Sequence, residues 1–135
     1  MRRLTLLILL FGLTLSVSAC SASTANISSA QLARGYADNK AVDPTSTFAT
    51  TDTPLHYVVT LSNAPDDTKV KSAWTAVDAG DGQYKDKKID ETELTSAGGV
   101  LDFTLASKQA WPAGKYKVDL YLNDKLDRTA EFTIE

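Results

Sequence analysis

The stretch from residue 111 to residue 122, WPAGKYKVDLYL, decides the fold of this 135-residue chain. After its Trp-Pro-Ala-Gly segment, apolar and polar side chains alternate, and the apolar face carries Tyr116, Val118, Leu120 and Leu122. A period of two is typical of a strand with one buried face. Asn123 and Asp124 follow and tolerate the positive φ angles of a tight turn, so residues 129–134 are expected to return as the last strand.

The same alternation recurs upstream in short runs that turn residues separate. Strands are expected at residues 27–33, 47–50, 55–61, 69–77 and 101–105, with turns at 63–67, 78–82 and 96–99. No run of ten or more residues has the spacing of an amphipathic helix. The sequence therefore predicts an all-β fold, an antiparallel β-sandwich of about seven strands.

Residues 84–94, YKDKKIDETEL, carry charge at nearly every position except Tyr84, Ile89 and Leu94. Lysines and acidic side chains on a strand discourage pairing with a second molecule, and natural proteins place them on exposed sheet edges for that reason. We expect this segment to form an edge strand.

Residues 101–105, followed by residues 111–118, resemble the corner between strands E and F of immunoglobulin-like and fibronectin III-like domains. The resemblance implies that the Tyr116 hydroxyl hydrogen-bonds back to the corner that contains Gly114, and that Trp74 is the core tryptophan of strand C. The chain departs from antibody domains because it lacks their disulfide pair. Residues 48–135 also resemble small bacterial lipoproteins of uncharacterised function that share a Trp-Pro-x-Gly-x-Tyr corner.

The N-terminus has the order of a secretory signal. Arg2 and Arg3 precede an apolar run at residues 4–15, and small residues follow up to Cys20. As a helix the run would span about 18 Å, short of the roughly 30 Å hydrocarbon core, which disfavours a permanent transmembrane helix. Residues 1–19 are expected to form a signal peptide.

Residues 17–20, Val-Ser-Ala-Cys, resemble the lipobox of bacterial lipoproteins. The resemblance implies cleavage between Ala19 and Cys20, a diacylglyceryl thioether on Cys20 and usually a third acyl chain on its amine. More than one chain is what makes such an anchor stable. Residues 20–29 are expected to be the lipidated Cys and a flexible tether, and residues 30–135 the sandwich domain.

The expected location is the bacterial cell envelope, with the membrane as a partner through the lipid anchor. Ser21 stands where Asp favours inner-membrane retention in enterobacteria, so a bacterium with two membranes should hold the chain on the outer membrane, facing the periplasm. In a bacterium with one membrane, the extracellular face is expected.

Composition argues against several function classes. The chain has 14 basic and 17 acidic residues, and loss of Arg2 and Arg3 with the signal would leave 12 and 17, a net charge of −5. An acidic surface disfavours nucleic-acid binding. With one Cys, one His and one Met, we expect no cofactor, no metal site and no catalytic residues.

Two groups of residues are candidate chemical sites. His56 is the only imidazole, and no sequence motif supplies it with a nucleophile or a paired carboxylate, so a solvated or packed strand histidine is favoured. The acidic residues between 78 and 93 do not match an EF-hand, and lysines lie among them, so a Ca²⁺ site there is disfavoured without being excluded.

The expected contact residues are Tyr121 and Lys117, on the outward face of their strand, and Asp81 in a loop. For Tyr121 the alternative is cross-strand pairing, and Trp111 is expected to pack as core. We expect a non-enzymatic binding or scaffolding module of the envelope, with an envelope protein as a possible partner. Two alternatives stay open: an inhibitor of secreted or periplasmic proteases, with wedges at residues 78–83 and 106–114, and an enzyme with an unrecognised pocket.

Overall fold

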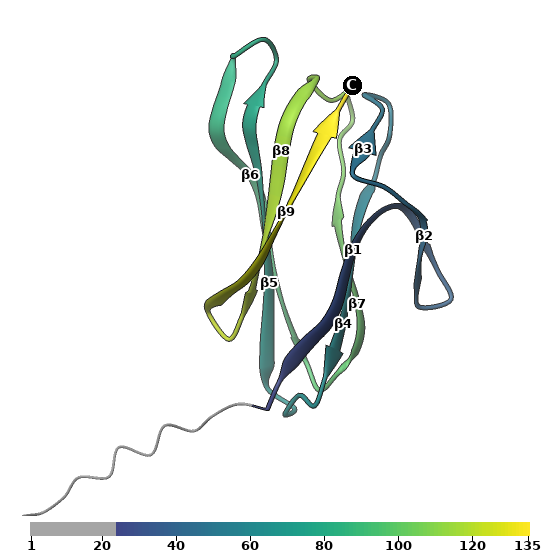
Figure 1. The fold of residues 1–135 in the computed structure, drawn as a ribbon, viewed down its shortest axis with the longest axis vertical. Helices are drawn as coiled ribbons and strands as arrows, with labels where there is room; N and C mark the ends of the chain where they lie inside the picture. The colour runs from purple at the N-terminus through teal and green to yellow at the C-terminus, as the bar shows by residue number, and fades with distance from the viewer. Residues whose placement is uncertain (1–23) are drawn as a thin grey trace, which may run out of the picture.

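Two packed β-sheets make up residues 24–135, the part of the chain that the computed structural model describes (Figure 1). The first sheet has four strands in the order β2-β1-β4-β7. Its members are β1 (Asn26–Ala37), β2 (Lys40–Pro44), β4 (Leu55–Ser62) and β7 (Gly99–Leu105). All neighbours in this sheet are antiparallel.

The second sheet has five strands in the order β3-β9-β8-β5-β6. They are β3 (Thr47–Phe48), β9 (Lys125–Ile134), β8 (Gly114–Leu122), β5 (Thr68–Ala79) and β6 (Tyr84–Ser96). Only β3 pairs in parallel, with β9. The expected all-β sandwich is confirmed, and so is the place of the charged segment at a sheet edge, as β6. The described residues form nine strands rather than about seven.

The strand with no counterpart among the expected ranges is β2, which has no alternating pattern because none of its five side chains enters the core. It pairs with β1 because Asp38 and Asn39 adopt positive φ angles of 50° and 58° and reverse the chain. Backbone hydrogen bonding, which period-two analysis does not detect, therefore creates this strand.

The core lies between the sheets and is built around aromatic side chains from both. Trp74 is fully buried, and its ring meets those of Tyr57 and Phe132 edge-on at centroid distances of 6.3 and 5.9 Å. Phe132 also stacks on Tyr116 and meets Phe48 edge-on. Such pairs stabilise a core beyond the area they bury. The alternation of β4, β7 and β8 points one face of each strand into this cluster.

The expected tether, residues 20–29, overlaps the first strand of the domain. Strand β1 begins at Asn26, and Ile27 is only 2% exposed and pairs with Leu61 of β4. The register of β1 against β4 shifts at a bulge just after Ile27. Ile27 is the one apolar residue in a polar stretch, and the strand forms there because β4 supplies the partner backbone. Residues 26–29 belong to the sandwich and not to a tether. The expected signal peptide, the Ala19–Cys20 cleavage and Cys20 lipidation lie outside the described residues.

The described chain enters the sandwich at one end, where Thr24 Oγ1 donates a hydrogen bond of 2.8 Å to the carbonyl of Asn63. The β5–β6 turn, the β7–β8 connection and the C-terminus lie at the opposite end (Figure 1). We call this opposite end the distal end. The turns at residues 63–67 and 80–82 are therefore separated, the first beside the chain entry and the second at the distal end. Within residues 24–135 no helix is long and apolar enough to cross a membrane.

The buried tyrosine of β4 makes stability depend on alkaline pH. Burial raises the pKa of Tyr57 from 10.0 to about 12. Below about pH 10 the phenol is protonated in both states, and between about pH 10 and 12 only the unfolded chain releases the proton. The free energy of unfolding should fall across that window by about 2 kcal/mol. Urea unfolding at a series of pH values would measure the fall.

Tyr57→Phe is the matched variant, because it removes the titrating hydroxyl and keeps the ring. It should flatten most of the alkaline slope, with a remainder from Tyr116, whose pKa burial also raises. An unchanged slope in this variant would show that other groups cause the alkaline loss of stability.

Candidate binding groove

The outer face of the five-stranded sheet holds Tyr121 and Lys117, and both belong to a group of charged and aromatic side chains that contact one another. Lys117 Nζ lies 3.4 Å from Asp119, and Thr129 donates a 2.5 Å hydrogen bond to the same carboxylate. Across the strands, Tyr121 pairs with Lys71, whose ammonium lies 4.6 Å from the ring centroid. The proposed contact residues thus sit within a network that the sheet already satisfies. Their role in binding a partner stays a prediction.

This network continues to β6 through Glu91. Lys71 Nζ lies 3.7 Å from Glu91, and Lys88 contacts the same carboxylate. The Lys88 hydrogen bond holds the pKa of Glu91 below its ordinary value. Exposed pairs of this kind add little stability. Their effect is that Lys71, Lys88 and Glu91 already have partners on this face.

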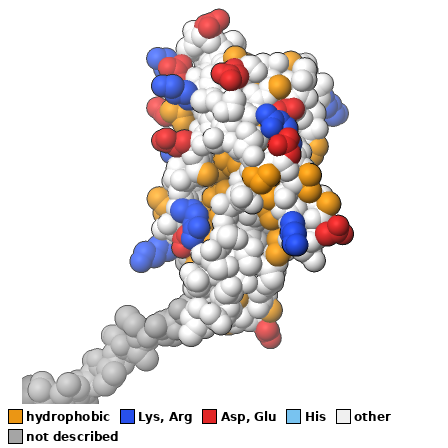
Figure 2. Space-filling view, turned by 45° about the vertical axis from the view of Figure 1, so that its right-hand side comes forward, with side chains coloured by type: hydrophobic (Ala, Val, Ile, Leu, Met, Phe, Trp, Pro, Cys, Tyr) orange, Lys and Arg blue, Asp and Glu red, His pale blue; other side chains and the backbone are white. Residues whose placement is uncertain are grey.

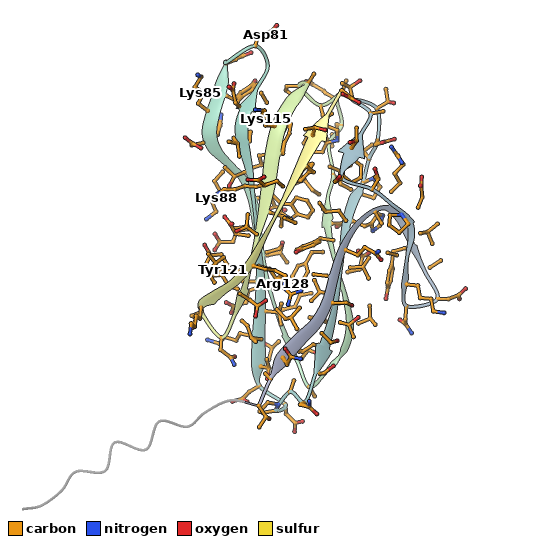
Figure 3. The ribbon with its side chains drawn as sticks, viewed as in Figure 1. Asp81, Lys85, Lys88, Lys115, Tyr121 and Arg128 are labelled. Atoms are coloured by element: carbon orange, nitrogen blue, oxygen red, sulfur yellow. The ribbon has the colours of Figure 1, made fainter. Side chains whose placement is uncertain are left out.

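Asp81 lies far from Tyr121. It occupies the tip of the β5–β6 hairpin with a φ of 54°, whereas Tyr121 lies toward the end where the chain enters (Figure 3). Along β5, the distance from the partner of Tyr121 to Ala79, just before the tip, is roughly 26 Å at about 3.3 Å per residue. The three expected contact residues therefore do not form one site.

At the distal end, hydrogen bonds fix the corner between β7 and β8. The Trp111 amide donates to the Thr50 carbonyl and its indole Nε1 to the Asp52 carbonyl, each at 2.8 Å. The Tyr116 hydroxyl donates to the Pro112 carbonyl at 2.5 Å, which is the backward bond that the immunoglobulin resemblance implies. Trp111 is 8% exposed, so it packs as core.

The Asp52 side chain holds the segment that accepts the Trp111 bonds. Its carboxylate accepts from the Ala49 amide at 2.8 Å and from Arg34 Nε at 3.0 Å, and the first of these bonds is the main reason that its pKa is lowered. Arg34 also pairs with Asp43 of β2 at 3.1 Å. These contacts tie the β1–β2 hairpin to the corner and pre-organise the loop that contains Trp111.

Replacing Tyr116 by Phe tests the corner bond directly. The change removes the hydroxyl and leaves the Pro112 carbonyl without this donor, while the ring can still stack on Phe132. We expect the free energy of unfolding to fall by about 1 kcal/mol, measured by urea denaturation. A variant as stable as the parent would mean that the bond contributes nothing to the corner.

Beside this corner lies a groove of about 340 Å³, between the loop at residues 107–112 and the first residues of β6. We call it the distal groove. Its apolar lining comes from Ala76, Tyr84, Ile89, Trp111, Pro112 and Tyr116. Ile89 is 38% exposed, although it is a large apolar residue. A concave apolar site with few polar groups is the usual form of a ligand site, and this volume is at the small end of the range.

The polar lining of the distal groove includes two cations and no acid. Lys87 and Lys88 line it with Ser107 and Gln109. Lys88 is paired with Glu91, whereas Lys87 forms no ion pair within residues 24–135, and its ammonium lies 5.3 Å from the Tyr84 ring centroid. The sequence does not reveal this groove, because the groove depends on which loop packs beside β6. The one available signal was the isolated Ile89 in a charged strand.

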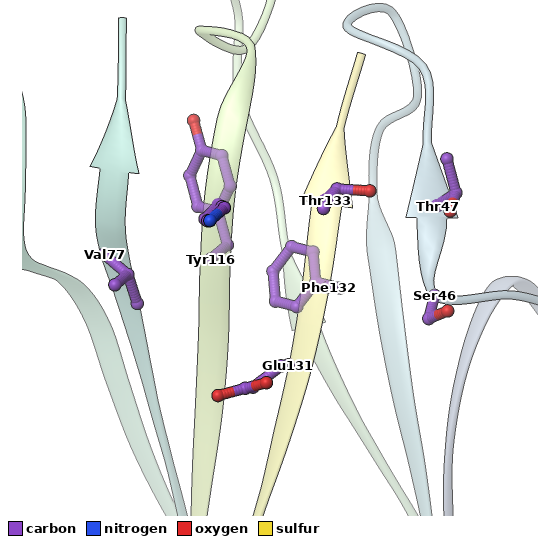
Figure 4. Close-up of a pocket in the computed structure, with 8 residues that line it drawn as sticks. Ser46, Thr47, Val77, Tyr116, Glu131, Phe132 and Thr133 are labelled. Atoms are coloured by element: carbon purple, nitrogen blue, oxygen red, sulfur yellow. The ribbon is translucent and has the colours of Figure 1, made fainter. Parts of the chain in front are cut away.

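Two further hollows are open and polar. One of about 440 Å³ lies along β3, β9, β8 and the end of β5, where Thr47, Thr133 and Glu131 line a floor of paired strands (Figure 4). Another of about 280 Å³ lies where the turn at residues 39–41 meets β1 and β4. On the face shown in Figure 2, acidic and basic side chains are interspersed, which creates no broad field of one sign. The first hollow also has Lys115 in its lining beside Glu131, so it carries one charge of each sign, unlike the distal groove.

His56 has a carboxylate partner that the sequence did not reveal. Its Nδ1 lies 2.9 Å from Asp102 across the β4–β7 pairing, and both side chains are mostly buried. Within the described part of the chain, no hydroxyl or thiol hydrogen-bonds to His56, and no cluster of three His, Cys, Asp or Glu side chains could hold a metal ion. The pair is a His–Asp dyad without a bonded nucleophile, and it links two strands.

Comparison with known proteins identifies the fold. No protein-family model and no curated protein matches the chain. A solved immunoglobulin-like protein from Pseudomonas aeruginosa is 11% identical, with a TM-score of 0.59, over 82% of this chain and 96% of that one. A β-glucosidase from Listeria innocua is 14% identical, with a TM-score of 0.49, over 82% of this chain and only 16% of the enzyme. The first likeness shows that this chain has an immunoglobulin-like fold.

Proposed function

We propose that the chain is a lipid-anchored, non-enzymatic binding module of the bacterial envelope. The observation that carries the proposal is the separation of its two ends. The described chain enters at one end beside Asn63, and the distal groove lies toward the other. An anchor at Cys20 would hold the first end near the lipid and present the groove away from it. The proposed location is the outer membrane facing the periplasm, or the outer face of a single membrane.

The anchor is tested by the mass of the mature N-terminus. The full chain, produced in a bacterium, should be recovered from the membrane fraction starting at Cys20, with the added mass of acyl chains on its N-terminal peptide. Cys20→Ala should lack that added mass. A mature wild-type chain that begins at another residue, or an unmodified Cys20, would refute the anchor.

Binding is tested by capture from a detergent extract of the source envelope, with a chain from residue 21 onward as bait. This chain contains every described strand and the whole core, from Ile27 to Ile134. We expect saturable capture of an envelope protein, and we expect Ile89→Ser to weaken this capture. Tyr121→Ala is run in parallel, because loss of capture in that variant would show that the partner binds the outer face of the five-stranded sheet. Capture unaffected by both variants would refute both sites.

Protease inhibition stays a second candidate because the structure brings its two proposed wedge loops together. The Gly80 amide donates to the Ala113 carbonyl at 2.9 Å, so residues 78–83 and 106–114 meet at the distal end. Titration of the chain from residue 21 against a panel of envelope and secreted proteases tests this. An absence of inhibition at micromolar protein would end the candidate.

A further inference from the structure

We infer that the distal groove binds an extended, acidic peptide segment of a partner protein. The inference rests on the proposed binding function and adds the chemistry of the partner. Three features of the groove support it: an apolar surface that is already formed, an unpaired lysine at its side, and an adjoining strand edge with no neighbouring strand.

The apolar surface is held in place before any ligand arrives. Trp111 is fixed by two hydrogen bonds to residues 50 and 52, and Pro112 by the Tyr116 hydroxyl. Opposite them, Ile89 is exposed on β6 although burial would be favourable. An apolar side chain of a ligand placed between Ile89 and Pro112 would be shielded from water. The residues that line the groove would not have to become ordered for this to happen. A volume of about 340 Å³ suits one or two side chains better than a whole domain.

The charge beside this surface selects an acidic ligand. Lys87 has no carboxylate partner among residues 24–135, and no acidic residue lines the groove. Lys85 and Lys88 lie on the same outer strand (Figure 3). Asp86 and Asp90 belong to β6 as well, but they do not line the groove. A carboxylate next to the bound apolar side chain would form a charge-assisted hydrogen bond with Lys87.

The adjoining edge favours a peptide over a compact small molecule. Among the strands of residues 24–135, β6 pairs only with β5, so one side of its backbone faces no described strand. An extended peptide can use such backbone groups and place alternate side chains in a pocket. The lysines of β6 and its bulge at Ile89 protect this edge from pairing with arbitrary strands. A segment with carboxylates opposite the lysines would still pair with it. The same lysines would then both prevent pairing with other strands and select an acidic peptide.

The test uses two matched six-residue peptides, acetylated, amidated and labelled at one end. One alternates glutamate with valine and phenylalanine, and the other has lysine in place of glutamate. Fluorescence anisotropy would be measured with the chain from residue 21 at low ionic strength, where charge pairing is least screened. We expect the glutamate peptide to bind at least about tenfold more tightly than the lysine peptide.

Two variants locate the binding. Lys87→Glu should remove the preference for the glutamate peptide, and Ile89→Ser should weaken both peptides. Lys125→Glu is the matched control, because it makes the same charge change at the first residue of β9, at the far end of the sheet. It should leave the preference intact. All three positions are exposed, so folding should be retained, which circular dichroism and a melting curve would check.

Equal binding of both peptides, or a preference that Lys87→Glu does not change, would overturn the inference. Failure of both peptides to bind at millimolar concentration would overturn it too. The envelope capture separates this result from the proposed function. If the peptides fail while Ile89→Ser still weakens capture, the groove binds a partner of different chemistry. If capture also fails, the binding function itself is refuted.

Discussion

Replacing Gly114 by Ala should destabilise the domain more than any other single methyl group added to its glycines. Gly114 has a φ of 152°, and a Cβ built there would overlap the Asp78 carbonyl oxygen and lie 2.5 Å from the Ala79 Cα. Both contacts are with the backbone of β5, which cannot move without breaking its pairing with β8. We expect the free energy of unfolding to fall by about 3 kcal/mol or more.

Gly99→Ala is the control for this change. Gly99 also has a positive φ, 86°, but a Cβ there would meet no atom within 4 Å. Its cost should be limited to backbone strain, about 1 kcal/mol. Urea denaturation of both variants separates the two effects. Equal losses in the two would show that strain alone, and not the close approach to β5, explains the requirement for glycine at 114.

Truncating the central tryptophan should have the second large effect. Trp74 is fully buried and touches aromatic rings of both sheets, so Trp74→Ala leaves a cavity that the surrounding strands cannot fill. We expect a loss of about 3–5 kcal/mol. A small domain is often stable by only about 5–15 kcal/mol, so this variant is expected to be largely unfolded on warming.

Trp74→Phe distinguishes packing from hydrogen bonding. The Trp74 Nε1 is buried and has no hydrogen-bond partner within the described residues, so removing it sacrifices no bond. Phe also keeps a ring for the edge-on contacts. We expect it to cost less than half of what alanine costs. If the two substitutions were equally damaging, the indole nitrogen would need a partner such as a bound water.

The sequence predicts the sandwich because its core strands alternate cleanly. In β8, the face that carries Tyr116 and Val118 is the buried one, as the period of two requires. Residues that lack this signal are not predicted: β2 pairs with β1 without a buried face of its own, and Ile27 enters the core beside a bulge. Local pattern cannot show either effect, because the partner strand supplies the stabilising contacts.

The candidate site was harder to predict because it depends on pairing between distant segments. His56 and Asp102 are 46 residues apart and meet only through the β4–β7 register. The distal groove likewise needs β6 and the loop at residues 107–112 to lie side by side. Outward alternation suggested Tyr121 as a contact residue, yet it could not show that Lys71 lies over its ring. The period-two pattern of a strand predicts which side chains share a face. Which side chains of other strands lie beside them depends on the pairing register, which the pattern does not predict.

The opposite placement of the chain entry and the distal groove has a mechanical consequence. A ligand held in the groove while the N-terminus is held at a membrane would pull along the long axis of the sandwich, roughly parallel to its strands. Ladder hydrogen bonds run across the strands, so such a pull loads many of them together in shear rather than peeling them one by one. The same antiparallel pairing that encloses the core would make the module resistant to tension.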